Sequence, residues 1–119
     1  MNSKLKVFLL CLTLSCSVSW AAGDKDIQYR GFTYCGEWVK SRKTTVGTIE
    51  GFSRLNVEAK LVAFLSGLAV GVQNDFLRDA NLESLYLWMD NYCEKNPLSN
   101  SFEGAAYLAL ELTEKRRSK

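Results

Sequence analysis

The chain has 119 residues, of which 47% are apolar and 24% charged, an ordinary globular composition that excludes disordered and collagen-like proteins. It has 15 basic and 13 acidic residues and no histidine. The lack of histidine removes the commonest general base, the usual partner of a serine or cysteine nucleophile, and most zinc sites. The composition therefore predicts a protein that is not an enzyme and that carries no metal or other cofactor.

Residues 1–21 have the three parts of a secretory signal peptide. Lys4 and Lys6 form the basic start, residues 7–14 form the apolar run, and Ser19-Trp20-Ala21 fits a small-x-small cleavage site. A membrane anchor would need about 20 strongly apolar residues, whereas this stretch is interrupted by threonine and serine. We therefore expect export of a mature chain of 98 residues, with 13 basic and 13 acidic residues once the two leader lysines are removed. That balance gives no electrostatic footprint for nucleic acid, and we expect no membrane span in the mature chain.

Cleavage also removes Cys11 and Cys16, so that two of the four cysteines remain, Cys35 and Cys93. In an exported protein a lone pair of cysteines is expected to form a disulfide, and two free buried thiols are the alternative. In the chain-entropy model a loop of this size contributes about 4 kcal/mol to stability. A catalytic C-x-x-C motif is absent from the sequence around either cysteine.

The first part of the mature chain contains one short helical pattern between two irregular segments. Residues 22–33 are polar with two glycines, which predicts a flexible N-terminal segment and a domain that extends over residues 34–119. Cys35, Trp38 and Val39 then have the same-face spacing of a helix. Residues 43–53 show neither a helical period nor a strand alternation, so we interpret them as a loop.

The strongest helical pattern begins after Asn56, which we predict as the cap. Apolar residues recur over about five turns at helical spacing: Val57, Leu61, Phe64, Leu65, Leu68, Val72 and Phe76. The other side of this helix carries a strip of small residues in steps of four: Ala59, Ala63, Gly67 and Gly71. The strip has two interpretations, close packing within the domain, which we favour, and a groove for self-association or for a partner.

Two further helices follow. Asn81 or Asp79 can cap the first, whose apolar stripe ends at Cys93, and Asn96-Pro97 ends it. The last helix follows the cap at residues 99–101, where Asn100 and Glu103 resemble a capping box. Together these elements predict an all-α domain, a small bundle of about four helices stapled by one disulfide.

The charged residues of this half have plain structural interpretations. Asp90 and Glu94 are four residues apart, which predicts an exposed helix face and disfavours a glycosidase-like acid pair. The basic residues at 115–117 and 119 are favoured at a helix C-terminus by the helix dipole, and they promote solubility.

Five segments in order carry a resemblance to a known family: C-G-E-W at 35–38, F-L-S-G-L at 64–68, L-W-M-D-N-Y-C at 87–93, N-P-L at 96–98 and A-A-Y-L-A-L-E-L at 105–112. The chain resembles small exported bacterial proteins related to the Rap/Tai immunity proteins, which neutralise peptidoglycan amidases delivered by type VI secretion. The resemblance implies an all-helical periplasmic protein, often a homodimer, that binds a secreted peptidoglycan amidase and occludes its active site through a loop.

Two polar connections between helices are our candidates for the binding residues, because a short loop on a rigid helix loses little entropy on binding. The candidate residues are Asn74, Asp75, Arg78, Asp79, Asn81, Asn96, Leu98, Ser99 and Asn100. Ordinary capping and turn chemistry is the alternative explanation for the same residues.

Two other functions fit the same features. A periplasmic acid-stress chaperone of the HdeA type is similar in size, helicity and its single long-range disulfide, and it would expose apolar faces when its carboxylates protonate. An exported helical domain with some other partner is the third interpretation.

Overall fold

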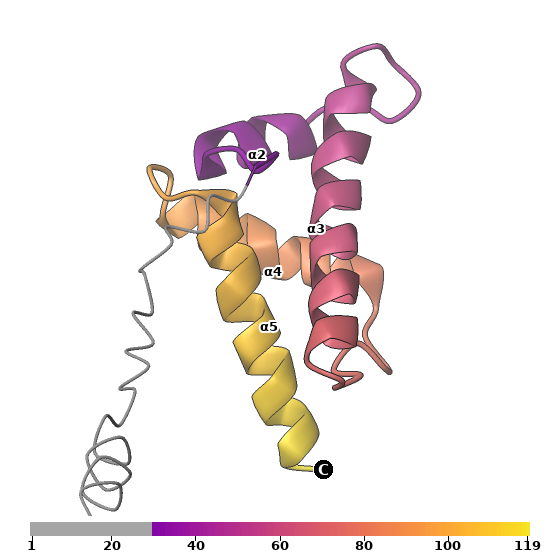
Figure 1. Ribbon diagram of the computed structural model, residues 1–119. Helices are drawn as coiled ribbons and strands as arrows, with labels where there is room; N and C mark the ends of the chain where they lie inside the picture. The colour runs from indigo at the N-terminus through magenta and orange to yellow at the C-terminus, as the bar shows by residue number, and fades with distance from the viewer. Residues whose placement is uncertain (1–29) are drawn as a thin grey trace, which may run out of the picture.

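The structure is a computed structural model that describes residues 30–119 and forms an all-α bundle in that range. Its helices are α2 (Cys35–Arg42), α3 (Gly51–Gly71), α4 (Leu82–Lys95) and α5 (Ser101–Arg117). Figure 1 shows α2 across one end of the molecule, α3 and α5 along its length, and α4 crossing behind them. The predicted bundle of about four helices is confirmed. The predicted signal peptide and residues 22–29 of the predicted N-terminal segment lie outside the described residues.

Helix α4 forms the centre of the fold, because α2 and α5 both pack against it. The core is built from side chains that every helix contributes. Its most deeply buried members include Trp38, Leu61, Leu65, Met89 and Leu108. Burial of each large apolar side chain contributes roughly 1.5–3 kcal/mol, which makes this cluster the main source of stability. None of the four described helices is long and apolar enough to cross a membrane.

The predicted disulfide between Cys35 and Cys93 is present and joins the start of α2 to α4. Both cysteines are fully buried, and their Cα atoms are 4.7 Å apart. The backbone beside the disulfide is paired as well. The N–H of Cys35 donates to the carbonyl of Ser99 at 2.8 Å, and the N–H of Gly36 donates to that of Pro97 at 3.2 Å. The short helix α2 is therefore held by a covalent bond and by hydrogen bonds to the α4–α5 connection.

Contacts with the helical domain begin before residue 34. The ring of Phe32 makes edge-to-face contacts with Phe64 on α3 and Phe102 on α5, with centroid distances of 5.5 and 5.4 Å. The N–H of Ser101 donates to the carbonyl of Thr33 at 2.8 Å. Phe32 and Thr33, which the sequence analysis assigns to the N-terminal segment, thus pack against the bundle.

Helix α3 begins and ends earlier than its apolar period predicts. It starts at Gly51, and Asn56, the predicted cap, lies inside it. At the other end the helix stops at Gly71, and Gln73 adopts a left-handed backbone conformation with φ of 52°. The reversal leaves Val72 exposed and brings Phe76 into the core from the following connection. The predicted caps of the next two helices are confirmed, since the side chain of Asn81 accepts from Ser84 N–H and that of Asn100 from Phe102 N–H.

An ion network links three helices beside the core. Arg42 of α2 donates to Asp90 of α4 from Nε and Nη2, each at 3.1 Å, and also pairs with Glu58 of α3. Trp38 Nε1 donates to the same Asp90 carboxylate at 2.8 Å. The prediction that Asp90 lies on an exposed helix face is therefore wrong, because the indole and the guanidinium draw this carboxylate into the junction of α2 and α4. Glu94 is exposed, as expected.

Burial and charge shift two pKa values in this network. Burial alone would lower the pKa of the Arg42 guanidinium, but its hydrogen bonds and charge contacts with Asp90 and Glu58 raise it above its ordinary value. Burial raises the pKa of Tyr86, over whose ring the guanidinium of Arg42 lies, and the negative charge of Glu58 raises it further. Arg42 is thus a permanent cation that holds two carboxylates in place.

Candidate interaction surface

Large apolar side chains are exposed where α2 connects to α3. Ile49 is 85% exposed and Phe52 is 72% exposed, and they line a shallow hollow together with Leu55. Val46 is also exposed in the same connection. We call these four residues the apolar tip. Figure 1 shows the connection standing out beyond the end of α3. Exposed apolar side chains grouped in this way mark interaction sites more often than isolated ones do.

The connection that carries the apolar tip is held by its own backbone. Thr48 Oγ1 donates to the carbonyl of Thr45 at 2.8 Å, and the N–H of Gly51 donates to the Thr48 carbonyl at 3.0 Å. A Cβ atom at Gly51 would overlap the Thr45 carbonyl, so only glycine allows this close approach. A loop with such internal bonds loses less conformational entropy on binding than a flexible one.

The outward face of α3 extends the apolar tip. Ala59, Ala63, Gly67 and Gly71 are all exposed, and no other part of the described chain lies within 4 Å of where a Cβ would stand at either glycine. The favoured interpretation of this strip, close packing within the domain, is therefore wrong. The small residues have no described intramolecular neighbour because α3 contacts α2 and α5 with its opposite side. The sequence from Leu61 to Asn74 contains no charged residue, so the second half of this face is uncharged.

The first predicted binding segment, the α3–α4 connection, is largely accessible. Asp75 and Arg78 are exposed and pair with each other, with Nε to Oδ2 at 3.1 Å. Asp79 is exposed as well, whereas Asn74 is half-buried. The side chain of Asn81 caps α4. Capping and turn chemistry thus explain part of this segment, and its role in partner binding remains a prediction.

The second predicted binding segment, the α4–α5 connection, uses most of its polar groups internally. Asn96 Nδ2 donates to the carbonyl of Tyr92 at 2.9 Å, the Ser99 carbonyl accepts from Cys35, and Asn100 caps α5. Leu98 is the exception, because its side chain is 90% exposed. The two predicted segments lie at opposite ends of α4, so they do not form one surface. Of the second segment, Leu98 is the residue placed to contact a partner.

A row of aromatic rings lies along α4 and α5. The rings of Trp88 and Tyr92 are stacked with centroids 5.6 Å apart, and Tyr107 follows Tyr92 at 6.0 Å. Trp88 Nε1 donates to Glu111 at 2.8 Å, which fixes the indole. Tyr107 is exposed and Tyr92 is half-buried, so the row reaches the surface at Tyr107.

Sequence reasoning missed the apolar tip. The signal was present, because Val46, Ile49 and Phe52 are large apolar residues in a segment with no period that could bury them. Within residues 30–119 no group of three or more Asp, Glu or Cys side chains is placed to hold a metal ion. The arrangement offers a preformed surface that is rich in exposed apolar and small side chains. Comparisons with protein-family models, with curated proteins and with solved structures gave no match.

Proposed function

We propose that this chain is a periplasmic immunity protein that binds a secreted peptidoglycan amidase and blocks its active site. The resemblance to the Rap/Tai proteins supplies the class of partner, and the signal-peptide pattern supplies the compartment. The observation that carries the proposal is the apolar tip, a projecting group of large apolar side chains on a self-supported loop and on the start of α3. A projecting rigid loop is suited to enter the cleft of an enzyme, because its shape is set before binding.

The decisive experiment measures binding and inhibition with the exported protein at neutral pH. Candidate secreted peptidoglycan amidases are tested for capture by the tagged protein and for loss of hydrolysis of isolated peptidoglycan. We expect one enzyme to be captured stoichiometrically and inhibited. If none of the candidate amidases is bound or inhibited, the proposal is wrong.

Single substitutions at three places then locate the contact surface. We expect Ile49→Asp at the apolar tip to weaken inhibition by about a hundredfold, because it puts a charge into an apolar contact. Leu98→Asp tests the α4–α5 connection, and Arg78→Ala tests the α3–α4 connection. Leu87→Asp is the matched control, since Leu87 is an exposed apolar residue of α4 outside all three places. If Ile49→Asp inhibits normally and either Leu98→Asp or Arg78→Ala does not, the contact surface lies at the connection that carries the inactive variant.

The outward face of α3 supports a second proposal, that two copies of the chain associate through it. Ala59, Ala63 and Val70 fall on one line of the helix, and all are exposed. Sedimentation velocity of the protein is expected to give a dimer, and Ala63→Glu is expected to give a monomer, whereas Ser84→Glu on the exposed side of α4 keeps the dimer. A monomeric parent protein at micromolar concentration would contradict this second proposal.

The ion network favours one alternative function, the acid-stress chaperone. The junction of α2, α3 and α4 depends on the charges of Arg42, Glu58 and Asp90, and packing that depends on charge is what an acid-triggered chaperone needs. Suppression of client aggregation below about pH 3, with no amidase bound at neutral pH, would favour the chaperone. Amidase binding at neutral pH with no chaperone activity in acid would exclude it.

A further inference from the structure

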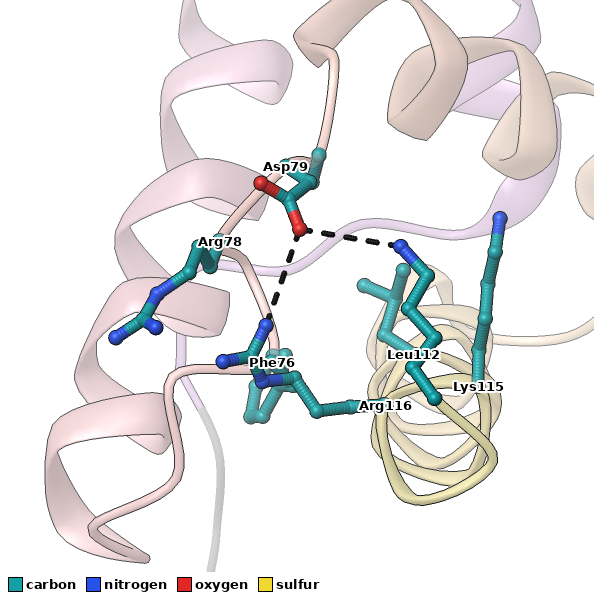
Figure 2. A pocket seen from close by; sticks show the side chains of 8 residues that line it. Phe76, Arg78, Asp79, Leu112, Lys115 and Arg116 are labelled. Carbon is teal, nitrogen blue, oxygen red and sulfur yellow. Dashed lines mark ion pairs between the residues drawn. The ribbon is translucent and has the colours of Figure 1, made fainter.

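A small pocket at the far end of α3 from the apolar tip is rich in positive charge. It lies between the α3–α4 connection and the end of α5 and has a volume of about 80 Å³. Its lining combines an apolar floor with charged walls: Phe76, Ala80 and Leu112, and Arg78, Asp79, Lys115, Arg116 and Lys119. Figure 2 shows Asp79 pointing across the opening toward Arg116, with Phe76 and Leu112 beneath. The pocket is too small for a sugar or a nucleotide, whose sites occupy several hundred Å³.

Two cations of this pocket, Arg116 and Lys119, donate no hydrogen bond within residues 30–119. Arg116 Nη1 is 3.9 Å and Lys119 Nζ is 3.8 Å from Asp79 Oδ2, distances that are too long for hydrogen bonds. Among residues 30–119, Arg116 donates no hydrogen bond, although its side chain is only 33% exposed. A guanidinium has five donors in a planar fork that matches an oxyanion. The end of α5 therefore presents donors that the described chain leaves for another acceptor.

The one acidic residue of the pocket lies in a tight backbone turn. Asp79 has a φ of 69°, in the left-handed region that few residues other than glycine adopt. The turn is closed by a hydrogen bond from Ala80 N–H to the Leu77 carbonyl at 2.9 Å. Non-glycine residues in this region cost free energy and are concentrated at functional sites. The Asp79 carboxylate marks the point that Arg116 and Lys119 approach together.

We propose that this pocket binds a phosphate group. Arg78 is paired with Asp75, which leaves Lys115, Arg116 and Lys119 against the single carboxylate of Asp79. The three cations less the one carboxylate leave two positive charges, which match the two negative charges of a phosphate dianion. The tetrahedral phosphate also has oxygen acceptors for donors that come from several directions. Free inorganic phosphate and the phosphate of a lipid headgroup share this chemistry. The inference does not depend on the proposed inhibition of an amidase.

The test is a titration of the isotope-labelled protein with sodium phosphate at neutral pH and low ionic strength, followed by backbone amide NMR. We expect saturable shifts at Asp79, Ala80 and Arg116. The double variant Arg116→Gln/Lys119→Gln is expected to bind about tenfold more weakly, because each lost contact to a charged group is worth severalfold in affinity. Asp79→Asn is expected to bind about fivefold more tightly, because the competing negative charge is gone.

Lys40→Gln is the matched control, since Lys40 is an exposed lysine in the last turn of α2, and its binding is expected to equal that of the parent protein. A second arm measures co-sedimentation with phosphatidylglycerol or phosphatidylcholine vesicles. Binding to phosphatidylglycerol vesicles that is lost in the double variant, without binding of free phosphate, assigns the lipid headgroup as the source. The proposal is overturned if neither probe binds, if the double variant binds like the parent, or if Lys40→Gln weakens binding equally.

Discussion

At the scale of single residues, Arg42 determines how three helices meet. It pairs with one carboxylate on α3 and one on α4, and its guanidinium lies 5.1 Å from the centre of the Tyr86 ring. Burying charges costs much of what their pairing returns, so such a network adds little net stability while it remains complete. Removing the arginine alone is costly, because two unpaired carboxylates are then left beside the core.

We therefore predict that Arg42→Met lowers the free energy of unfolding by about 3 kcal/mol, because Glu58 and Asp90 lose their shared partner. Urea unfolding followed by the fluorescence of buried Trp38 measures the change. Arg54→Met is the control, since Arg54 is more exposed and pairs with Glu58 alone, and we expect it to cost less than about 1 kcal/mol. Equal effects of the two substitutions would contradict the central role of Arg42.

Tyr86 makes stability depend on pH at the alkaline end. Because burial raises its pKa in the folded state, the unfolded state loses this proton first as the pH rises. The stabilisation is complete below the unfolded pKa of about 10 and is lost as the pH rises through the higher folded value. In urea unfolding between pH 8 and pH 11, Tyr86→Phe is expected to show a smaller decline than the parent protein. Tyr107→Phe, at an exposed tyrosine, is the control, and its free energy of unfolding should fall with pH as that of the parent protein does. If Tyr86→Phe falls with the same slope as the parent protein, Tyr86 is not the source of the alkaline decline.

At the scale of elements, the sequence predicts helices well where a period and a cap coincide. Asn81 and Asn100 cap α4 and α5 as expected, because a side-chain oxygen at that position has a specific N–H to accept from. The start of α3 was not predictable in this way, since it depends on backbone bonds within the preceding turn and on the close approach of Thr45 and Gly51.

The candidate surface was harder to predict than the helices. Periodicity places Ala59 and Gly67 on one side of α3, but it cannot tell whether another helix covers that side. The same limit applies to Asp90, whose spacing from Glu94 gives no sign that Trp38 and Arg42, about 50 residues earlier, reach its carboxylate. Contacts between segments far apart in the sequence decide whether this side of α3 is covered and whether Asp90 is exposed. Such contacts cannot be read from the spacing of residues in a single sequence.

Two glycines provide a matched test of helix packing. Gly67→Ala should raise the free energy of unfolding of the separated chain by about 0.5–1 kcal/mol, because alanine favours a helix and nothing lies near the new methyl group. Gly104→Ala should lower it by about 1–3 kcal/mol, since a Cβ there would lie 2.7 Å from the Tyr92 ring. Urea unfolding at low protein concentration measures both. A loss of stability in Gly67→Ala would mean that this side of α3 is covered within the chain.

At the scale of the whole molecule, the two proposed binding places lie at opposite ends of α3. A helix of 21 residues is roughly 30 Å long, so the apolar tip and the phosphate pocket are separated by about that distance. Effects of substitutions that far apart add independently. We expect Ile49→Asp to leave phosphate binding unchanged and the double variant Arg116→Gln/Lys119→Gln to leave amidase inhibition unchanged.

One mass measurement tests the disulfide together with the predicted signal peptide. We expect protein purified from the periplasmic fraction to have the intact mass of residues 22–119 less two hydrogens. Reduction is expected to lower the free energy of unfolding by about 4 kcal/mol, given the 58-residue separation of Cys35 and Cys93. Two free thiols in the native product would contradict the oxidised pair, and an uncleaved mass would contradict the leader.

The attachment of residues 33–36 to residues 93–101 also sets an order of assembly. The short helix α2 is made early in synthesis, but its disulfide partner and the carbonyls of Pro97 and Ser99 come near the end of the chain. Until those residues have been delivered, Cys35 remains a free thiol on a helix too short to be stable by itself. The N-terminal helix therefore cannot be locked in place before residues 93–101 have been made, and its attachment depends on the end of the chain rather than on its neighbours in sequence.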